Sequence, residues 1–171
     1  MQLVDLTIEK VSRMLEQGEC TSVELTEACL ERIDASRDLG AWLHICAEQA
    51  LESAKASDER TQSTRRLGPL DGIPVGLKDI FLTRDVPTTC GSKILEGFLP
   101  PYDGTAVSKL RDAGAVMLGK LNMDEFAMGS SNEYSAYGPA KNPWDPTRVP
   151  DRKSTRLNSS HVTVSRMPSS A

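Results

Sequence analysis

A lysine near the middle of the chain is the first residue whose surroundings suggest chemistry. Lys78 follows the short apolar run Ile73–Leu77 in the segment GIPVGLKDIF. A lysine at such a place is commonly a surface residue whose ammonium group stays in water. If the side chain is buried instead, desolvation lowers its pKa, and the neutral amine can act as a base. Asp79 beside it is either an ion-pair partner or an exposed cap for the next helix.

A turn of small residues, 129–131 (Gly-Ser-Ser), is the second candidate for chemistry, and it follows the short apolar stretch Phe126–Met128. Glycine lets a backbone approach a ligand closely, and the amides and hydroxyls of such a turn can bind an anion or an oxyanion. The alternative is an ordinary loop at the end of a helix. Asp124 and Glu125 are adjacent, so on a helix they would point about 100° apart. We therefore expect them to be surface charges rather than a shared site.

Histidine and cysteine offer no further catalytic group. His44 and His161 are isolated in the sequence, so neither a histidine-based triad nor a metal site is expected. The four cysteines are far apart, with no spacing that suits a metal. We expect them to be buried thiols in a reducing compartment. They are Cys20, Cys29, Cys46 and Cys90.

Helices are predicted for the N-terminal part of the chain, ahead of both candidates. An approximate apolar stripe that begins near the N-terminus ends at Gly18, which is typical of an amphipathic helix. Thr21 and Glu24 then form a capping box in front of a second helix. After a short apolar patch, Trp42–Cys46, a third helix rich in Ala, Glu and Lys is expected from about Ala47 to Arg60.

An alternation of strands and helices begins after Gly68 and includes both candidates. The run Ile73–Leu77 is a strand candidate, a helix is expected over Thr105–Ala113, and a second strand candidate follows at Ala115–Leu118. This rhythm predicts an α/β fold, in which N-terminal helices precede the beginning of a mixed or parallel sheet covered by helices. A loop with little regular structure is expected from Tyr134 to Pro150.

The last segment, residues 151–171, differs in composition from everything before it. It is rich in serine and has few large apolar residues and no periodic pattern, so it should be disordered. Asp151–His161 and Val164–Ala171 also read as the translation of a common sequencing-library adapter. A genuine serine-rich tail is the alternative. We therefore expect residues 1–150 to be the N-terminal part of a folded domain and residues 151–171 to be an artefactual tail.

Charge and hydropathy limit the class of protein. The net charge is −4, which gives no general attraction to nucleic acid or to anionic lipid. No apolar run approaches the roughly 20 residues that a membrane span requires. The N-terminus has neither the basic and apolar regions of a signal peptide nor an Arg/Ser-rich presequence. We expect a soluble, cytoplasmic protein that does not contact a membrane.

Three segments together carry a resemblance to a known family. GIPVGLKDIF, TTCGSKILEGFLPPYDGTAVSKLRDAGAVMLGKLNMDEFAMGSS and NPWDPTRVP resemble the amidase signature family, and the likeness covers residues 1–150. The resemblance implies a triad of a lysine, a bridging serine in a non-proline cis peptide, and a nucleophilic serine. Lys78 matches the lysine. Met128, Gly129 and Ser130 match a loop that lines the substrate pocket.

The two serines of that triad have no counterpart in this chain. In the family a Gly/Ser-rich segment with the bridging serine follows the NPWDPTRVP-like run, and the nucleophile comes later. Here Asp151-Arg152-Lys153-Ser154-Thr155 follows instead. Because a base without a nucleophile does not carry out acyl transfer, we expect the 171-residue chain to be inactive by itself.

The segment KLNMDEFAMGSS resembles one branch of the family in particular, the glutamine-hydrolysing subunits of tRNA-dependent amidotransferases. The resemblance implies that the intact protein releases ammonia from glutamine through a seryl acyl-enzyme. The B and C subunits, as partners, would use that ammonia, with ATP and Mg, to convert glutamate on tRNA(Gln) to glutamine. It implies no cofactor in this chain and contact with tRNA mainly through the B subunit.

Two other functions remain open from the sequence. A stand-alone amidase would share the chemistry, since the residues that select its substrate would lie beyond Pro150. A short non-catalytic binding protein that keeps the front of the fold is a hypothesis of another class, and it requires the serine-rich ending to be genuine.

Overall fold

Residues 3–150 are described by a computed structural model, and the predicted tail at 151–171 lies outside the described residues. Helices come first along the chain, and strands alternate with helices after them. The α-helices are α1 (Ile8–Gln17), α2 (Ser22–Ala35), α3 (Ala47–Gln62) and α4 (Thr105–Asp112), and the strands are β1 (Trp42–Ile45), β2 (Pro74–Lys78) and β3 (Val116–Leu121). Short 3-10 turns are η1 (Leu3–Asp5), η2 (Arg37–Leu39), η3 (Lys93–Leu95) and η4 (Glu125–Ala127).

The ends of the first two helices follow the local sequence signals. Gly18 ends α1 in the left-handed conformation with φ 71°, where glycine has no Cβ to clash. The capping box before α2 is present, because the Thr21 side chain accepts a hydrogen bond from the Glu24 amide and the Glu24 carboxylate accepts one from the Thr21 amide. Both predictions are confirmed.

The sheet is mixed and has the strand order β1-β3-β2. β2 and β3 are parallel, as expected for strands joined through a helix, whereas β1 pairs with β3 in the antiparallel direction. The register places Leu77 opposite Lys120 and Lys78 opposite Leu121. The predicted α/β fold with a helix-covered mixed sheet is therefore confirmed, although β1 was expected only as an apolar patch.

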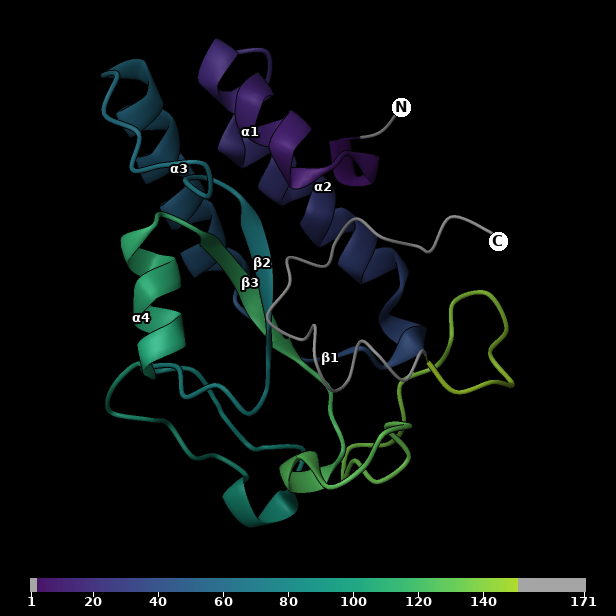
Figure 1. The fold of residues 1–171 in the computed structure, drawn as a ribbon. Coiled ribbons are helices and arrows are strands. Elements are labelled where there is room, and N and C mark those ends of the chain that lie inside the picture. Colours follow the sequence, from purple (N-terminus) through teal and green to yellow (C-terminus); the bar gives the residue numbers. More distant parts are fainter. Residues whose placement is uncertain (1–2, 151–171) are drawn as a thin grey trace.

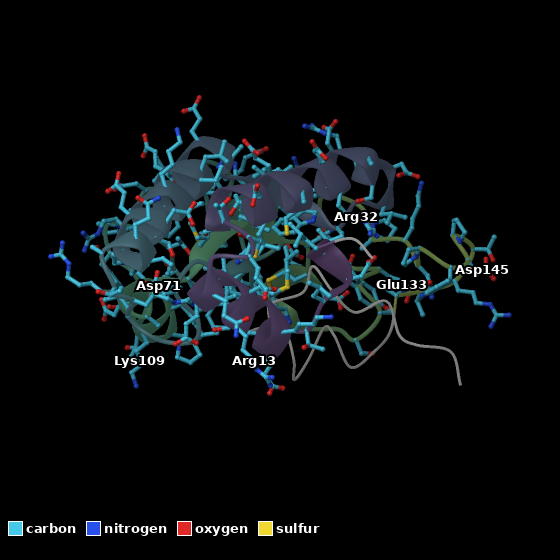
Figure 2. The ribbon with its side chains drawn as sticks, turned by 90° about the horizontal axis from the view of Figure 1, so that it is seen from above. Arg13, Arg32, Asp71, Lys109, Glu133 and Asp145 are labelled. Carbon is cyan, nitrogen blue, oxygen red and sulfur yellow. The ribbon has the colours of Figure 1, made fainter. Side chains whose placement is uncertain are left out.

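Helices cover both faces of the sheet, and each face has its own apolar core (Figure 1). One core joins α1, α2 and α3 to the sheet through Ile73, Val116 and Leu118. The other joins α4 to the sheet through Val75, Leu77 and Met117. Charged side chains lie at the outside of the molecule, such as Arg13 on α1 and Lys109 on α4 (Figure 2). None of the helices within residues 3–150 is long and apolar enough to cross a membrane.

The segments that follow β2 and β3 pack against each other below the sheet in the view of Figure 1. The Cys90 carbonyl accepts a hydrogen bond of 2.9 Å from the Phe126 amide, and the Gly91 carbonyl accepts one of 2.8 Å from the Ala136 amide. Gly91 has φ 68°, and a Cβ there would lie 2.5 Å from the Met123 carbonyl oxygen. Both catalytic candidates from the sequence lie at this end of the sheet.

Candidate active site

Lys78 is the last residue of β2, and it is buried. Its exposed fraction is 7%, so the surface-lysine alternative is excluded. Burial lowers the pKa of the Lys78 ammonium from its ordinary value, while the negative charge of Asp124 acts in the opposite direction. Lys78 is therefore buried with a lowered pKa, as a lysine that acts as a base has to be.

Asp79 is also buried, at 1% exposure, so it is not an exposed helix cap. One carboxylate oxygen lies 3.4 Å from Lys120 Nζ. The other accepts hydrogen bonds from the Thr89 amide at 2.9 Å, from the Thr89 hydroxyl at 2.5 Å and from the Gly91 amide at 3.4 Å. Asp79 is thus an ion-pair partner, as one alternative held, and its partner in this pair is Lys120.

Lys120, on β3, is a second buried lysine that the sequence did not bring out. Its exposed fraction is 0%, and its ammonium donates to the Phe81 carbonyl at 2.6 Å and to the Thr88 hydroxyl at 2.8 Å. Burial lowers the pKa of Lys120 as well, against the opposing charge of Asp79. Its position inside the apolar run Ala115–Leu121 could have identified Lys120 from the sequence, because a lysine buried in such a strand needs a carboxylate partner.

The two lysines lie on opposite faces of the sheet. Leu77 pairs with Lys120 across the strands, and Leu77 belongs to the core under α4. Side chains alternate between faces along a strand, so Lys78 points to the face opposite that of Leu77. The Lys120–Asp79 pair therefore fixes the end of β2 from one side and leaves Lys78 on the other.

The expectation that Asp124 is a surface charge is wrong. Asp124 is 3% exposed, and its carboxylate accepts hydrogen bonds from the Asn132 amide at 3.0 Å and from the Tyr134 amide at 3.1 Å. The expectation assumed a regular helix, whereas Asp124 has non-helical backbone angles, φ −59° and ψ 142°, ahead of the single turn η4. Glu125 is not a free surface charge either, because it accepts a hydrogen bond from the Ser92 hydroxyl.

The Met128–Ser130 loop begins after a tight turn and packs on Asp124. Phe126 and Ala127 both have positive φ, of 49° and 60°, which non-glycine residues seldom adopt. A Cβ on Gly129 would overlap the Asp124 carboxyl group. Met128 is 72% exposed. The loop is therefore more than a simple helix end, and Asp124 connects it with Lys78.

Cysteine does not provide an alternative nucleophile among residues 3–150. Cys20, Cys29 and Cys46 are buried as expected, and Cys90 is half-buried. Burial raises the pKa of the Cys29 thiol to about 12 and raises the pKa of the other three thiols. A thiol with a raised pKa is a poor source of thiolate at neutral pH.

His44, the histidine among residues 3–150, lines a depression to which Lys78 does not contribute. His44 lies on β1 beside a depression of about 480 Å³, which is also lined by Arg37 and Trp42 but not by Lys78. Within residues 3–150, no three side chains of His, Cys, Asp or Glu are placed to hold a metal ion. The depression therefore does not coincide with the buried lysine, and the burial and charges around Lys78 define the candidate site.

A comparison with known families decides the class of this chain. The sequence model of the family named Amidase matches residues 24–150. The chain belongs to the amidase family. Among curated amidase-family relatives, it is 56% identical over 150 residues to the A subunit of glutamyl-tRNA(Gln) amidotransferase from Chloroflexus aurantiacus, covering 87% of this chain and 31% of the relative. It is 53% identical over 151 residues to the corresponding protein of Streptomyces avermitilis, covering 88% and 30%.

Solved structures of amidase-family enzymes share the fold. A peptide amidase from Stenotrophomonas maltophilia superposes with a TM-score of 0.76 at 35% identity, over 84% of this chain and 31% of that one. The A subunit of glutamyl-tRNA(Gln) amidotransferase from Thermotoga maritima gives a TM-score of 0.68 at 35% identity, over 87% and 30%. The chain thus spans about a third of the length of the relatives it matches.

Proposed function

We propose that the intact protein to which this chain belongs is the glutaminase subunit of a glutamyl-tRNA(Gln) amidotransferase. The observation that carries the amide-hydrolysing part is the buried amine of Lys78, whose pKa burial lowers. The relatives named as the A subunits of glutamyl-tRNA(Gln) amidotransferases, at 53–56% identity, support glutamine as the amide. The released ammonia would serve the amidation of glutamate on tRNA(Gln).

In this proposal Lys78 acts as the general base. Its neutral amine takes a proton from a bridging serine, and that serine takes the proton of a nucleophilic serine as the latter attacks the amide carbonyl. The relay returns the proton to the amide nitrogen, so that ammonia leaves and a seryl ester remains, and water hydrolyses this ester to glutamate and restores the serine. The two serines are not assigned to residues of this chain, so Lys78 is the one member of the triad that we place.

The choice of Lys78 over Lys120 follows from its match to the lysine of the family's triad, because Lys120 stands in an ion pair with Asp79. The ammonium of Lys120 donates hydrogen bonds to the Phe81 carbonyl and the Thr88 hydroxyl and lies 3.4 Å from the Asp79 carboxylate. The carboxylate that acts on Lys78 is Asp124, which already accepts hydrogen bonds from two backbone amides. Burial lowers the pKa of both lysines, so it is the match to the family's lysine that selects Lys78 as the proposed base.

Met128, Gly129 and Ser130 are proposed to line the substrate pocket. The closeness of Gly129 to Asp124, the carboxylate that acts on Lys78, supports this placement. The exposure of Met128 leaves its side chain available to cover a substrate. Glycine at position 129 would then serve the close packing of the loop.

The partners that we propose are the B and C subunits of the amidotransferase, in the cytoplasm. ATP and Mg would be used by the assembled complex, and tRNA would be contacted through the B subunit. The net charge of −4 supports a tRNA contact made mainly by another chain. The family resemblance implies no cofactor in this chain itself, and we propose none for it.

A stand-alone amidase is the second candidate, because the backbone superposes better on the peptide amidase than on the Thermotoga protein. The test uses the full-length protein, with ammonia release measured from glutamine and from a peptide amide, and with affinity purification in the presence of B and C subunits. We expect glutamine hydrolysis and a stable complex. Hydrolysis of the peptide amide alone, without association, would establish the stand-alone amidase instead.

A further inference from the structure

We propose that Asp124 is a positioning residue that holds the Met128–Ser130 loop in place in front of Lys78. The inference rests on the proposed function, because it concerns the placement of the amide substrate beside the base. Asp124 follows β3, and Lys78 ends the neighbouring strand β2. A group at this point can act on both the loop and the lysine.

The first argument is the network of hydrogen bonds that closes the loop. The Asp124 carboxylate accepts from the Asn132 and Tyr134 amides, one on each oxygen. The Tyr134 carbonyl in turn accepts from the Glu125 amide at 3.2 Å. The two ends of the loop are therefore fastened around one buried carboxylate, and charge-assisted bonds of this kind are stronger than neutral ones.

The second argument is the packing of Gly129. The backbone of Gly129 lies so close to Asp124 that any side chain at position 129 would overlap the carboxyl group. The carboxylate thus supports the middle of the loop as well as its end. Phe126 and Ala127 keep positive φ angles in the same turn, which persists only where the surroundings hold it.

The third argument concerns the charges around Lys78. Asp124 stabilises the ammonium form of Lys78 against the effect of burial. On the other face of the sheet, Asp79 and Lys120 pair with each other, and Cys90 lies near that pair with a thiol whose pKa is raised. Asp124 is therefore the carboxylate through which the loop and the lysine are coupled.

The experiment compares Asp124→Asn with wild type in the full-length enzyme assembled with its partner subunits. The amide keeps the volume but loses the charge and one of the two acceptor positions for backbone amides. We expect KM for glutamine to rise about tenfold, the factor for one charge-assisted hydrogen bond lost. We also expect the acidic limb of kcat/KM to move to lower pH, because the Lys78 ammonium loses a stabilising charge.

The matched control is Glu133→Gln, the same chemical change at an exposed position of the same loop. Its KM and pH profile should equal those of wild type. A second variant, Gly129→Ala, should raise KM by pushing the loop away from the carboxylate, and it covers the case in which Asp124→Asn does not fold. An Asp124→Asn enzyme with wild-type KM and an unmoved acidic limb, or a Gly129→Ala enzyme with wild-type KM, would overturn the proposal.

The same assays separate this proposal from the proposed function. If wild type hydrolyses another amide but not glutamine, glutamine is the wrong substrate. The variants are then assayed with the amide that wild type hydrolyses. A rise of KM for that amide in Asp124→Asn supports the positioning role, and an unchanged KM overturns it. If wild type hydrolyses no amide, both proposals fall.

Discussion

The buried ion pair between Lys120 and Asp79 gives the sharpest prediction about stability. Lys120→Met keeps a long apolar side chain in the core but removes the ammonium from its three oxygen partners. Asp79 then remains buried at 1% exposure, with hydrogen bonds from Thr89 and Gly91 but without a counter-charge. Removing one member of a buried pair costs about 3–5 kcal/mol. We therefore expect the free energy of unfolding of Lys120→Met to be lower than that of wild type by about this amount.

A double variant separates the pair itself from simple loss of packing. In Lys120→Met with Asp79→Asn, the uncompensated charge is gone, and the asparagine oxygen still accepts from Thr89. We expect the double variant to be more stable than Lys120→Met alone, with a coupling energy of about 1–3 kcal/mol. Lys109→Met, the same change at an exposed position on α4, should have little effect (Figure 2).

The assay is the midpoint of thermal unfolding of the full-length protein, measured by calorimetry. Because a large protein need not unfold in one step, the midpoints are ranked among variants. The predicted ranking is wild type and Lys109→Met highest, the double variant intermediate and Lys120→Met lowest. If the double variant unfolds at or below the midpoint of Lys120→Met, the two residues do not stabilise each other, and the reasoning is refuted.

Three other predictions concern single residues. Gly91→Ala should destabilise the protein by about 1–3 kcal/mol, because its φ of 68° and the nearby Met123 carbonyl both oppose a side chain; an unchanged unfolding midpoint would contradict this. Thr21→Ala should cost about 1 kcal/mol through loss of the cap on α2, again measured by thermal unfolding. In native protein at pH 8, a thiol reagent followed by mass spectrometry should label Cys90 before Cys29, whose pKa is about 12; the reverse order would contradict the burial.

Local rules explain why much of the fold could be predicted from the sequence. The Thr21–Glu24 capping box and the glycine at position 18 act within a few residues of themselves, so they define helix ends wherever they occur. The apolar run Ile73–Leu77 and the helix over Thr105–Ala113 are similarly local, and both are found within a residue of the expected bounds. From these elements the α/β fold follows.

Features that depend on remote contacts could not be predicted in the same way. β1 has only half-buried side chains, and it is a strand because β3 pairs with it. Lys120 inside an apolar strand gives no sign of which carboxylate it meets. Asp124 was expected at the surface, but its carboxylate is enclosed by Asn132 and Tyr134, whose amides donate hydrogen bonds to it from the far side of a turn. In each case a tertiary contact overrides the local pattern.

We propose that Lys78 is the base of an amide-hydrolysing enzyme, and the rate of glutamine hydrolysis by the full-length Lys78→Arg protein tests this role. Arginine keeps the positive charge but does not become neutral at ordinary pH. In wild type, burial lowers the pKa of Lys78, so activity should rise with pH as the amine loses its proton. We expect Lys78→Arg to lose at least about 10³-fold in kcat while remaining folded. A folded Lys78→Arg enzyme that keeps more than roughly a tenth of the wild-type rate would contradict it.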